Sequence, residues 1–294
     1  MTDSEQSETY GAMAVVRRIA ALREAVAAWK RAGERVGVVP TMGALHAGHM
    51  ALVEAARRDC DRVVTTIFVN PKQFNRPDDL DSYPRDEATD AARLVEAGVD
   101  LLFAPPVEEV YPEGFQTKVS VPLLSDCLCG LTRPGHMDGV ATVVAKLFLM
   151  TAAERAYFGE KDFQQLLVVR RMARDLDIPV EVVPVPTVRD ADGLALSSRN
   201  ALLSAGQRAR APVIHRTLTA MAGKLADGAA VAEILAWGRG ELNAGGVEKF
   251  DYLDLRAEDS LEELADLDRP ARLFVAGWMG AVRLIDNVAV AAKA

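Results

Sequence analysis

The sequence predicts an α/β fold in which a doubly wound parallel sheet is followed by a smaller C-terminal α+β domain. Over the first two thirds of the 294 residues, segments with the helical spacing of apolar residues alternate with short β-branched segments. This alternation is typical of a parallel sheet with helices on both faces, the Rossmann-like arrangement. Beyond about residue 188 the alternation stops, and two long helical segments precede three short strand-like ones.

Each element of the first part is predicted by a local pattern. Val15, Ile19 and Leu22 recur at helical spacing, and Gly33 ends that segment. A strand, a helix and a second strand at the observed spacing form a βαβ unit with a right-handed crossover. The expected elements are helix 15–31, strand 36–40, helix 49–58, strand 63–70, helix 87–97, strand 99–104, helix 139–153, strand 155–158, helix 163–176 and strand 180–187.

The part beyond residue 188 has a different character. We expect a domain boundary there, with residues 1–188 forming the Rossmann-like domain and residues 189–294 the smaller α+β domain. The polar N-terminus, about residues 1–10, is expected to be a disordered tail. The expected elements of the second part are a turn at 189–193, helices at 205–225 and 230–243, and antiparallel strands at 250–256, 272–276 and 283–288.

Composition excludes several classes of protein. Half the residues are hydrophobic and 26% are charged, as in a globular protein with sizeable cores. No apolar segment reaches the ~18 residues of a membrane span, and the acidic N-terminus lacks the features of a signal peptide. A net charge of -8 argues against a nucleic-acid partner. Three cysteines without a disulfide framework favour a reduced, cytoplasmic location.

The stretch VPTMGALHAGH (39–49) contains two of the four histidines, His46 and His49. It lies between an expected strand and an expected helix, where an open α/β sheet binds its ligands. Gly43 and Gly48 allow close approach to a ligand, and the N–H groups at the helix start favour an anion. Two imidazoles there could donate hydrogen bonds to phosphate oxygens. The alternative is that both histidines cap the helix or pack around the loop.

The two standard phosphate-binding loops are missing from the sequence. Neither G-x-x-x-x-G-K-[ST] nor G-x-G-x-x-G occurs. If the protein binds a nucleotide, the histidine turn is therefore the place where we expect it.

The H-x-G-H pattern in the first βα turn resembles the signature of the nucleotidyl-transferring Rossmann superfamily, which includes class I aminoacyl-tRNA synthetases. Longer strings narrow the resemblance to the pantothenate synthetase family, the pantoate–β-alanine ligases. They occur in order along most of the chain. The matching strings are PTMGALHAGH (40–49), IFVNPKQF (67–74), YPRD (83–86), RPGH (133–136), YFGEKDFQQL (157–166), PTVRDADGLALSSRN (186–200), DYLDLR (251–256) and LIDN (284–287).

The resemblance implies an ATP-dependent ligase. The pantoate carboxylate attacks the α-phosphorus of ATP and releases pyrophosphate, and the amine of β-alanine then attacks the pantoyl adenylate and expels AMP. No protein nucleophile is needed, so catalysis should depend on positioning and charge stabilisation. Residues 1–188 would bind ATP and pantoate, and residues 189–294 would act as a lid. ATP, Mg²⁺, pantoate and β-alanine are the implied small molecules, and a homodimer is the implied assembly.

The family motifs also imply roles for individual residues. His49 is the implied catalytic acid, with His46 its companion and Lys161 a phosphate-neutralising cation. Asn70, Gln73 and Gln165 would bind pantoate or β-alanine. The implied ATP-binding residues are Met42, Gly43, Ala44, Leu45, His46, Ala47, Gly48, His49, Gly159, Glu160, Lys161, Asp162, Val188, Leu196, Ser197, Ser198 and Arg199.

Ordinary structural roles remain open for several of these residues. Asn70 taken alone would be interpreted as a turn cap, and the GEKD segment taken alone as an ordinary solvated turn. Asp162 could either bond the ribose or cap the following helix. Asp90 is the candidate magnesium ligand, against the alternative of an exposed charge on a helix.

The chain also departs from the familiar family strings. Asp138 stands where an arginine is common, which puts a phosphate-binding role for that position in doubt. Leu196 replaces a frequent methionine, and Cys127 and Cys129 match no functional position, so we interpret them as structural. Three other functions are weighed against the ligase. They are another H-x-G-H nucleotidyltransferase, a non-catalytic nucleotide-binding regulator, and a tRNA synthetase, which the acidic chain disfavours.

Overall fold

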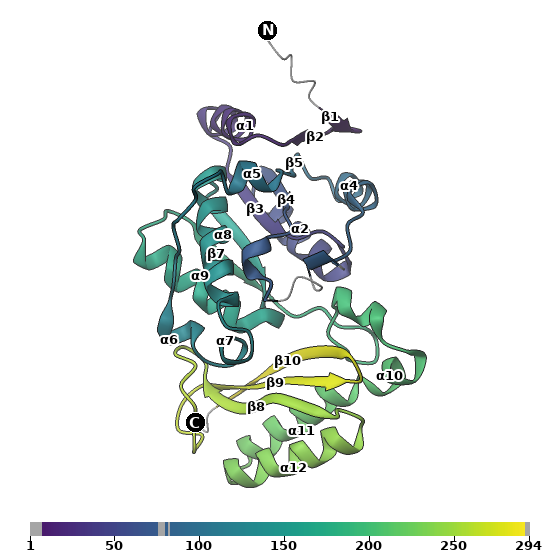
Figure 1. Cartoon of the computed structure of the whole chain (residues 1–294). Coiled ribbons are helices and arrows are strands. Elements are labelled where there is room, and N and C mark those ends of the chain that lie inside the picture. The colour runs from purple at the N-terminus through teal and green to yellow at the C-terminus, as the bar shows by residue number, and fades with distance from the viewer. Residues whose placement is uncertain (1–7, 76–79, 82, 292–294) are drawn as a thin grey trace.

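The computed structural model describes residues 8–75, 80–81 and 83–291 and contains two β-sheets (Figure 1). The larger has seven strands in the order β1-β2-β5-β4-β3-β6-β7, and the smaller has three in the order β10-β9-β8. This confirms the predicted fold class. The strands are β1 (Glu8–Tyr10), β2 (Met13–Val16), β3 (Val36–Thr41), β4 (Arg62–Ile67), β5 (Leu101–Phe103), β6 (Arg155–Gly159), β7 (Glu181–Val185), β8 (Lys249–Ala257), β9 (Ala271–Met279) and β10 (Val282–Val290).

The central strands of the large sheet, β3 to β6, are buried on both faces because apolar residues continue along them rather than alternate with polar ones. The side chains of successive residues in a strand therefore pack into different hydrophobic cores on the two faces of the sheet. On β3, Val38 packs with α1, α8 and α9, whereas Val39 packs with α2 and α4 on the other face. The helices are α1 (Ile19–Arg31), α2 (Ala47–Asp59), α4 (Glu87–Glu96), α5 (Val107–Val110), α6 (Pro122–Ser125), α7 (Cys129–Thr132), α8 (His136–Thr151), α9 (Phe163–Asp175), α10 (Ala205–Arg210), α11 (Val213–Ala226) and α12 (Val231–Ala244), with short 3-10 helices η1 (Pro71–Gln73), η2 (Glu160–Asp162) and η3 (Ser198–Leu202).

Strand order brings two βα turns together. From β3 the chain builds the sheet in one direction through β4 and β5, and then returns to place β6 on the other side of β3. The pairs β3–β4 and β3–β6 are both parallel. This reversal is the topological switch point of a doubly wound sheet, and ligands bind there, beyond the carboxyl ends of the strands. The turn after β3 carries the H-x-G-H pattern, and the turn after β6 carries GEKD.

The small sheet and helices α10 to α12 lie at one end of the molecule, below the large sheet in Figure 1. Its strands are antiparallel, as predicted. Helices α11 and α12 and the sheet share a hydrophobic core, but Phe274 and Leu261 belong to the core of the large sheet. The division near residue 188 stays a prediction. None of the described helices combines the length and the apolar character that crossing a membrane requires.

Three local predictions were wrong. Residues 8–10 form β1, which pairs with β2 across a turn at Gly11 (φ +58°), so only residues 1–7 of the expected tail lie outside the described part of the chain. Residues 13–16 are a strand because they gain a parallel partner in β5, and the helix begins at Ile19. The helix expected over 205–225 is two helices, since Pro212, which lacks an N–H, starts the second one.

Candidate active site

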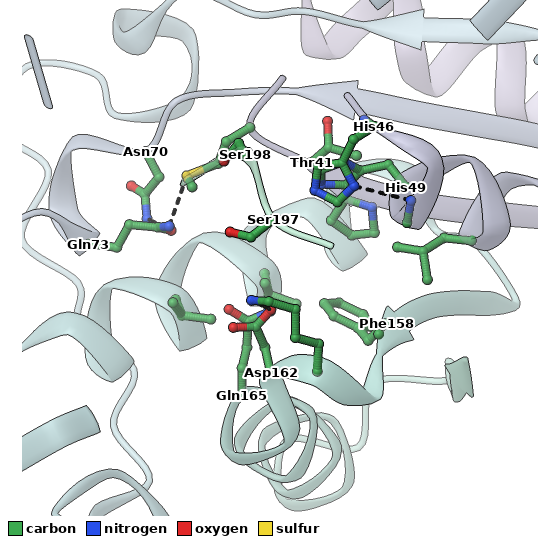
Figure 2. A pocket seen from close by; sticks show the side chains of 18 of the residues that line it. Thr41, His46, His49, Asn70, Gln73, Phe158, Asp162, Gln165, Ser197 and Ser198 are labelled. Carbon is green, nitrogen blue, oxygen red and sulfur yellow. Dashed lines mark hydrogen bonds and ion pairs between the residues drawn. The ribbon is translucent and has the colours of Figure 1, made fainter. Parts of the chain in front are cut away.

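The two histidines of the first turn cap the helix that follows and also line a cavity (Figure 2). His46 is the N-cap of α2, and its Nδ1 accepts from the Gly48 N–H at 3.1 Å. The Nδ1 of His49 accepts from the His46 N–H at 3.2 Å, and the two rings lie 4.1 Å apart. The capping role and the cavity-lining position, which the sequence analysis weighed as alternatives, therefore occur together.

This capping arrangement sets the protonation state of both rings. Because each Nδ1 accepts a backbone N–H, the proton of the neutral imidazole must be on Nε2. Burial, His46 and Lys161 lower the pKa of His49 to about 3, and burial with Lys161 lowers the pKa of His46. Both rings are therefore neutral at pH 7 and keep an Nε2–H as their donor. A polyphosphate bound beside them would raise both pKa values.

The turn is held from behind by α4. Asp90 is 2% exposed, and its two carboxylate oxygens accept the N–H groups of Ala44 and Leu45, each at 2.8 Å. Arg93 donates to the carbonyl of Leu45. Gly43 (φ +82°) allows this approach, since a Cβ there would lie 3.0 Å from Asp90. Asp90 is thus a buried anchor, which replaces the exposed-charge alternative, while its metal role stays a prediction.

The second turn carries the charges. Lys161 Nζ lies 3.6 Å from the Asp162 carboxylate, and the ammonium-bearing side chain is only 19% exposed. Burial raises the pKa of Asp162, but Lys161, Arg199 and His136 outweigh it, so the net shift is downward and the carboxylate is ionised. Asp162 stands at the N-cap position of α9, but its side chain makes no capping hydrogen bond there.

A residue from the small sheet fixes the backbone of this second turn. Asn287, on β10, donates from Nδ2 to the carbonyls of Glu160 and Lys161, each at 2.9 Å. Its Oδ1 accepts from Arg272 at 2.6 Å, so the amide cannot turn over. The LIDN string forms part of the family resemblance, but the sequence analysis gives Asn287 no role.

The SSR segment closes another side of the same cavity. Ser197 caps η3 by accepting the Arg199 N–H at 3.3 Å, and Ser198 and Tyr83 both line the cavity. In Figure 2, Ser197 lies between the histidines and the Asp162–Gln165 pair. Tyr83 belongs to the YPRD string, which the sequence analysis does not assign to the site.

The amides predicted to bind pantoate form a cluster next to the histidine turn. Asn70 is 1% exposed and Gln73 9% exposed, and they are joined by a hydrogen bond from Asn70 Nδ2 to Gln73 Oε1 of 3.0 Å. Asn70 also caps η1, because its Oδ1 accepts the Lys72 N–H at 3.2 Å, so the turn-cap alternative is correct for this residue. Helix α8, whose Gly139 carbonyl accepts from Asn70, presents Val140, Val143, Val144 and Leu147, which line the cavity at helical spacing.

The RPGH string supports this cluster. The ring of His136 donates from Nδ1 to the Gln73 carbonyl at 2.8 Å, and its Nε2 accepts from Arg133 at 3.0 Å. Burial and Arg133 lower the pKa of His136 to about 4, which keeps that acceptor unprotonated. Arg133 and His136 are site residues to which the sequence analysis assigns no role.

The structure gathers most of the predicted site residues around one cavity. Those that line it are Met42, His46, Gly48, His49, Asn70, Gln73, Gly159, Lys161, Asp162, Gln165, Val188, Leu196, Ser197, Ser198 and Arg199. Gly43, Ala44, Leu45, Ala47, Glu160 and Asp90 do not line it. Within the described residues, no group of three or more His, Cys, Asp or Glu side chains is arranged to hold a metal ion.

The departures at Asp138, Cys127 and Cys129 lie outside the cavity. Asp138 accepts from Lys118 at 2.9 Å and from Ser120 at 2.7 Å, so it ties the 118–120 segment to α8. Cys127 and Cys129 are free thiols. Cys129 Sγ lies 3.1 Å from the hydroxyl of Tyr252, which agrees with a structural interpretation.

Comparison with known proteins decides the family. The family model described as pantoate–β-alanine ligase matches residues 14–289. The chain belongs to the pantoate–β-alanine ligase family. It is 59% identical to the pantothenate synthetase of Chelativorans sp. (strain BNC1), over 95% of this chain and 99% of that protein. It is 57% identical to the pantothenate synthetase of Ruegeria pomeroyi, over 94% of this chain and 97% of that one.

Solved structures of the family share this fold over nearly their full length. A pantothenate synthetase from Thermus thermophilus superposes with a TM-score of 0.89 at 54% identity, covering 94% of this chain and 99% of that one. The pantoate–β-alanine ligase from Francisella tularensis, complexed with beta-gamma ATP and beta-alanine, gives a TM-score of 0.80 at 33% identity. That pair covers 95% of this chain and 98% of the Francisella chain.

Proposed function

We propose that this chain condenses pantoate with β-alanine at the expense of ATP, forming pantothenate and releasing AMP and pyrophosphate. The observation that carries the proposal is the content of the cavity at the switch point. It brings phosphate-type donors, His46, His49 and Lys161, into one cavity with the amides of Asn70, Gln73 and Gln165 and the apolar side chains of α8. The family membership and the Francisella complex support the same reaction.

The first step of the proposed reaction depends on positioned donors. One oxygen of the pantoate carboxylate attacks the α-phosphorus, the bond to the β-phosphate bridge oxygen breaks, and pyrophosphate leaves. The neutral Nε2–H groups of His46 and His49 donate to the oxygens on which charge builds, and Lys161 and Arg199 supply fixed positive charge. These groups are already held by caps and by Asn287, so little reorganisation is needed at the moment of reaction.

The second step needs still less from the protein. The β-alanine amine attacks the acyl carbon of the pantoyl adenylate, and AMP leaves because the mixed anhydride is a good acyl donor. The amine must arrive unprotonated and within about 3–3.5 Å of that carbon. No side-chain nucleophile is needed, which agrees with cysteines that lie outside the cavity.

The proposed pantoate subsite combines two kinds of surface. Gln73 and Gln165 offer amides to the hydroxyl and carboxylate oxygens. The Val140–Leu147 face of α8 covers the branched hydrocarbon part of the molecule and excludes water. Replacing Gln73 by Ala should therefore raise the KM for pantoate more than the KM for ATP.

Three further features belong to the proposal. ATP enters as its magnesium complex, since its phosphates supply oxygen ligands that the described residues do not gather into a cluster. Residues 189–294 serve as a lid domain, supported by the cavity-lining SSR segment and by Asn287. The active form is a homodimer in the cytoplasm; the family resemblance supports the dimer, and free cysteines the location.

The decisive experiment is exchange of labelled pyrophosphate into ATP, with pantoate present and β-alanine absent. The proposal expects exchange that depends on pantoate and, after β-alanine is added, AMP and pantothenate in equal amounts. A nucleotide-linked product in place of AMP would favour another nucleotidyltransferase. ATP binding without exchange would favour a non-catalytic regulator and would overturn the proposal.

A further inference from the structure

Asn70 lines the proposed pantoate subsite, but every hydrogen-bonding position of its side chain is already used inside the protein. Its Oδ1 accepts from the Lys72 N–H at 3.2 Å and from the Tyr111 hydroxyl at 2.8 Å. Its Nδ2 donates to the Gly139 carbonyl and to Gln73 Oε1, each at 3.0 Å. An amide has two acceptor and two donor positions, so the capacity of Asn70 is filled.

The orientation of the Asn70 amide is dictated by backbone groups. The Lys72 N–H can only donate, so the atom facing it is Oδ1; the Gly139 carbonyl can only accept, so the atom facing it is Nδ2. The close approach of α8 to η1 that makes this possible needs a glycine, because a Cβ on Gly139 would lie 2.2 Å from the Lys72 carbonyl oxygen.

The orientation of the Asn70 amide also fixes the orientation of the Gln73 amide. Because Asn70 Nδ2 donates to Gln73, the facing atom of Gln73 must be Oε1, and its Nε2 therefore turns toward the cavity. One of its N–H groups lies on the sulfur of Met42 at 2.9 Å, drawn as a dashed line in Figure 2. Gln73 thus presents a donor to the ligand, and the ligand group that meets it must be an acceptor, as pantoate oxygens are.

We infer that Tyr111 is a positioning residue for pantoate: the backbone sets which way the Asn70 amide faces, and the Tyr111 hydroxyl holds that amide in place against Gln73. Tyr111 lies at the end of α5, is 9% exposed, and packs between Phe68 and Phe115 with ring centroids 6.0 and 5.0 Å away. It does not line the cavity. Asn70 likewise acts through Gln73 rather than on the ligand. This inference rests on the proposed function, because it names the group that orients the acid subsite.

The test uses Tyr111→Phe in the full chain, which removes the hydroxyl and keeps the packed ring. Loss of one buried hydrogen bond, worth about 0.5–1.5 kcal/mol, predicts a roughly 2–10-fold rise in the KM for pantoate, with the KM for ATP and kcat nearly unchanged. In an Asn70→Ala background the same substitution should add nothing. Tyr252→Phe is the matched control, since it removes a part-buried tyrosine hydroxyl that hydrogen-bonds Cys129 outside the cavity.

Two results would overturn the inference. One is an unchanged pantoate KM in Tyr111→Phe, or equal rises for pantoate and ATP. The other comes from Gln73→Glu, which replaces the presented donor by an acceptor: at least about a tenfold rise in the pantoate KM is expected, and an unchanged or lower KM would contradict the orientation. Wild-type protein that fails to exchange pyrophosphate would instead count against the proposed function, so the two failures are distinguishable.

Discussion

The turns after β3 and β6 occupy equivalent positions on either side of the switch point, yet they are built in different ways. The β3 turn (residues 42–49) is neutral; its histidines are held by hydrogen bonds over three residues, and the N–H groups of Ala44 and Leu45 are held by Asp90 on helix α4. The β6 turn (residues 159–162) is charged, and its carbonyls are held by Asn287, more than 120 residues away along the chain. The donors for phosphate oxygens thus lie on a turn that is fixed by its own hydrogen bonds and by helix α4, whereas the charged turn is fixed by the small sheet.

The largest expected effect comes from separating the two roles of His49. In His49→Asn, the amide oxygen can replace Nδ1 as the cap for the His46 N–H, but no donor remains at the position of Nε2. We expect pyrophosphate exchange to fall by roughly 10²–10³, the scale for losing one charge-stabilising donor. The free energy of unfolding should change by less than about 1 kcal/mol.

His215→Asn, on α11 outside the cavity, is the control for this substitution and should exchange normally. Normal exchange in His49→Asn would mean that His49 only caps the helix. The β3 turn would then lose its proposed chemistry, and the comparison with the β6 turn would fail.

The next effect is on stability and concerns the anchor of the β3 turn. Asp90→Asn places an amide N–H against one of two backbone N–H groups that now donate to a carboxylate. Charge-assisted hydrogen bonds of this kind are worth about 1.5–3 kcal/mol each, so we expect urea unfolding to show a loss of roughly 2–4 kcal/mol.

The same variant tests the magnesium prediction. If Asp90 is only an anchor, the magnesium concentration for half-maximal exchange should be the same in Asp90→Asn as in wild type. A raised magnesium requirement, with little loss of stability, would instead make Asp90 a metal ligand. Asp86→Asn serves as the control, because it affects an exposed cap of the same helix.

Asn287→Ala removes the side-chain hydrogen bonds that fix the backbone of the β6 turn. It leaves the carbonyls of Glu160 and Lys161 without their amide donor and Arg272 without one acceptor. We expect a loss of about 1–3 kcal/mol in unfolding free energy. Displacement of Lys161 should raise the KM for ATP by roughly tenfold and the KM for pantoate less. Asn243→Ala, which changes an exposed asparagine on α12, is the control and should change neither the stability nor the KM values. Equal rises in the KM for ATP and for pantoate in Asn287→Ala would show that Asn287 does not act specifically on the ATP-binding part of the cavity.

The smallest effect is the pH dependence of stability. The pKa values of His46, His49 and His136 are all lowered in the folded state, to about 3 for His49 and about 4 for His136. Between these values and 6.5 the unfolded chain binds more protons than the folded one, so stability rises with pH. Lowering the pH from 7 to 5 should cost roughly 1–2 kcal/mol for each of His49 and His136.

Urea unfolding of wild type and of His136→Gln at pH 7 and pH 5 measures this contribution. The variant should lose less stability than wild type over this interval. An equal loss in both proteins would show that the His136 ring is not held neutral by the fold.

Local patterns predicted well those parts of the site that are themselves local. The H-x-G-H spacing indicated a helix start with two rings on one side, and Asn70 alone suggested a turn cap; both are seen. The predictions of a disordered tail up to Tyr10 and of a helix from Val15 were wrong, because these residues form strands with sheet partners that no local pattern reveals. A strand exists where a neighbour completes its hydrogen bonds, and that neighbour is distant in sequence.

By itself the sequence determined the α/β class, the resemblance to the family and the start of a helix at the histidine turn. The class follows from periodicity, the resemblance from motif strings that occur in order along the chain, and the helix start from local spacing. Only the tertiary structure decided that Asp90 anchors the first turn, that Asn287 holds the second, and that Tyr111 and His136 orient Gln73. Each of these is a contact between buried groups far apart in the chain, and their alignment depends on how whole layers pack.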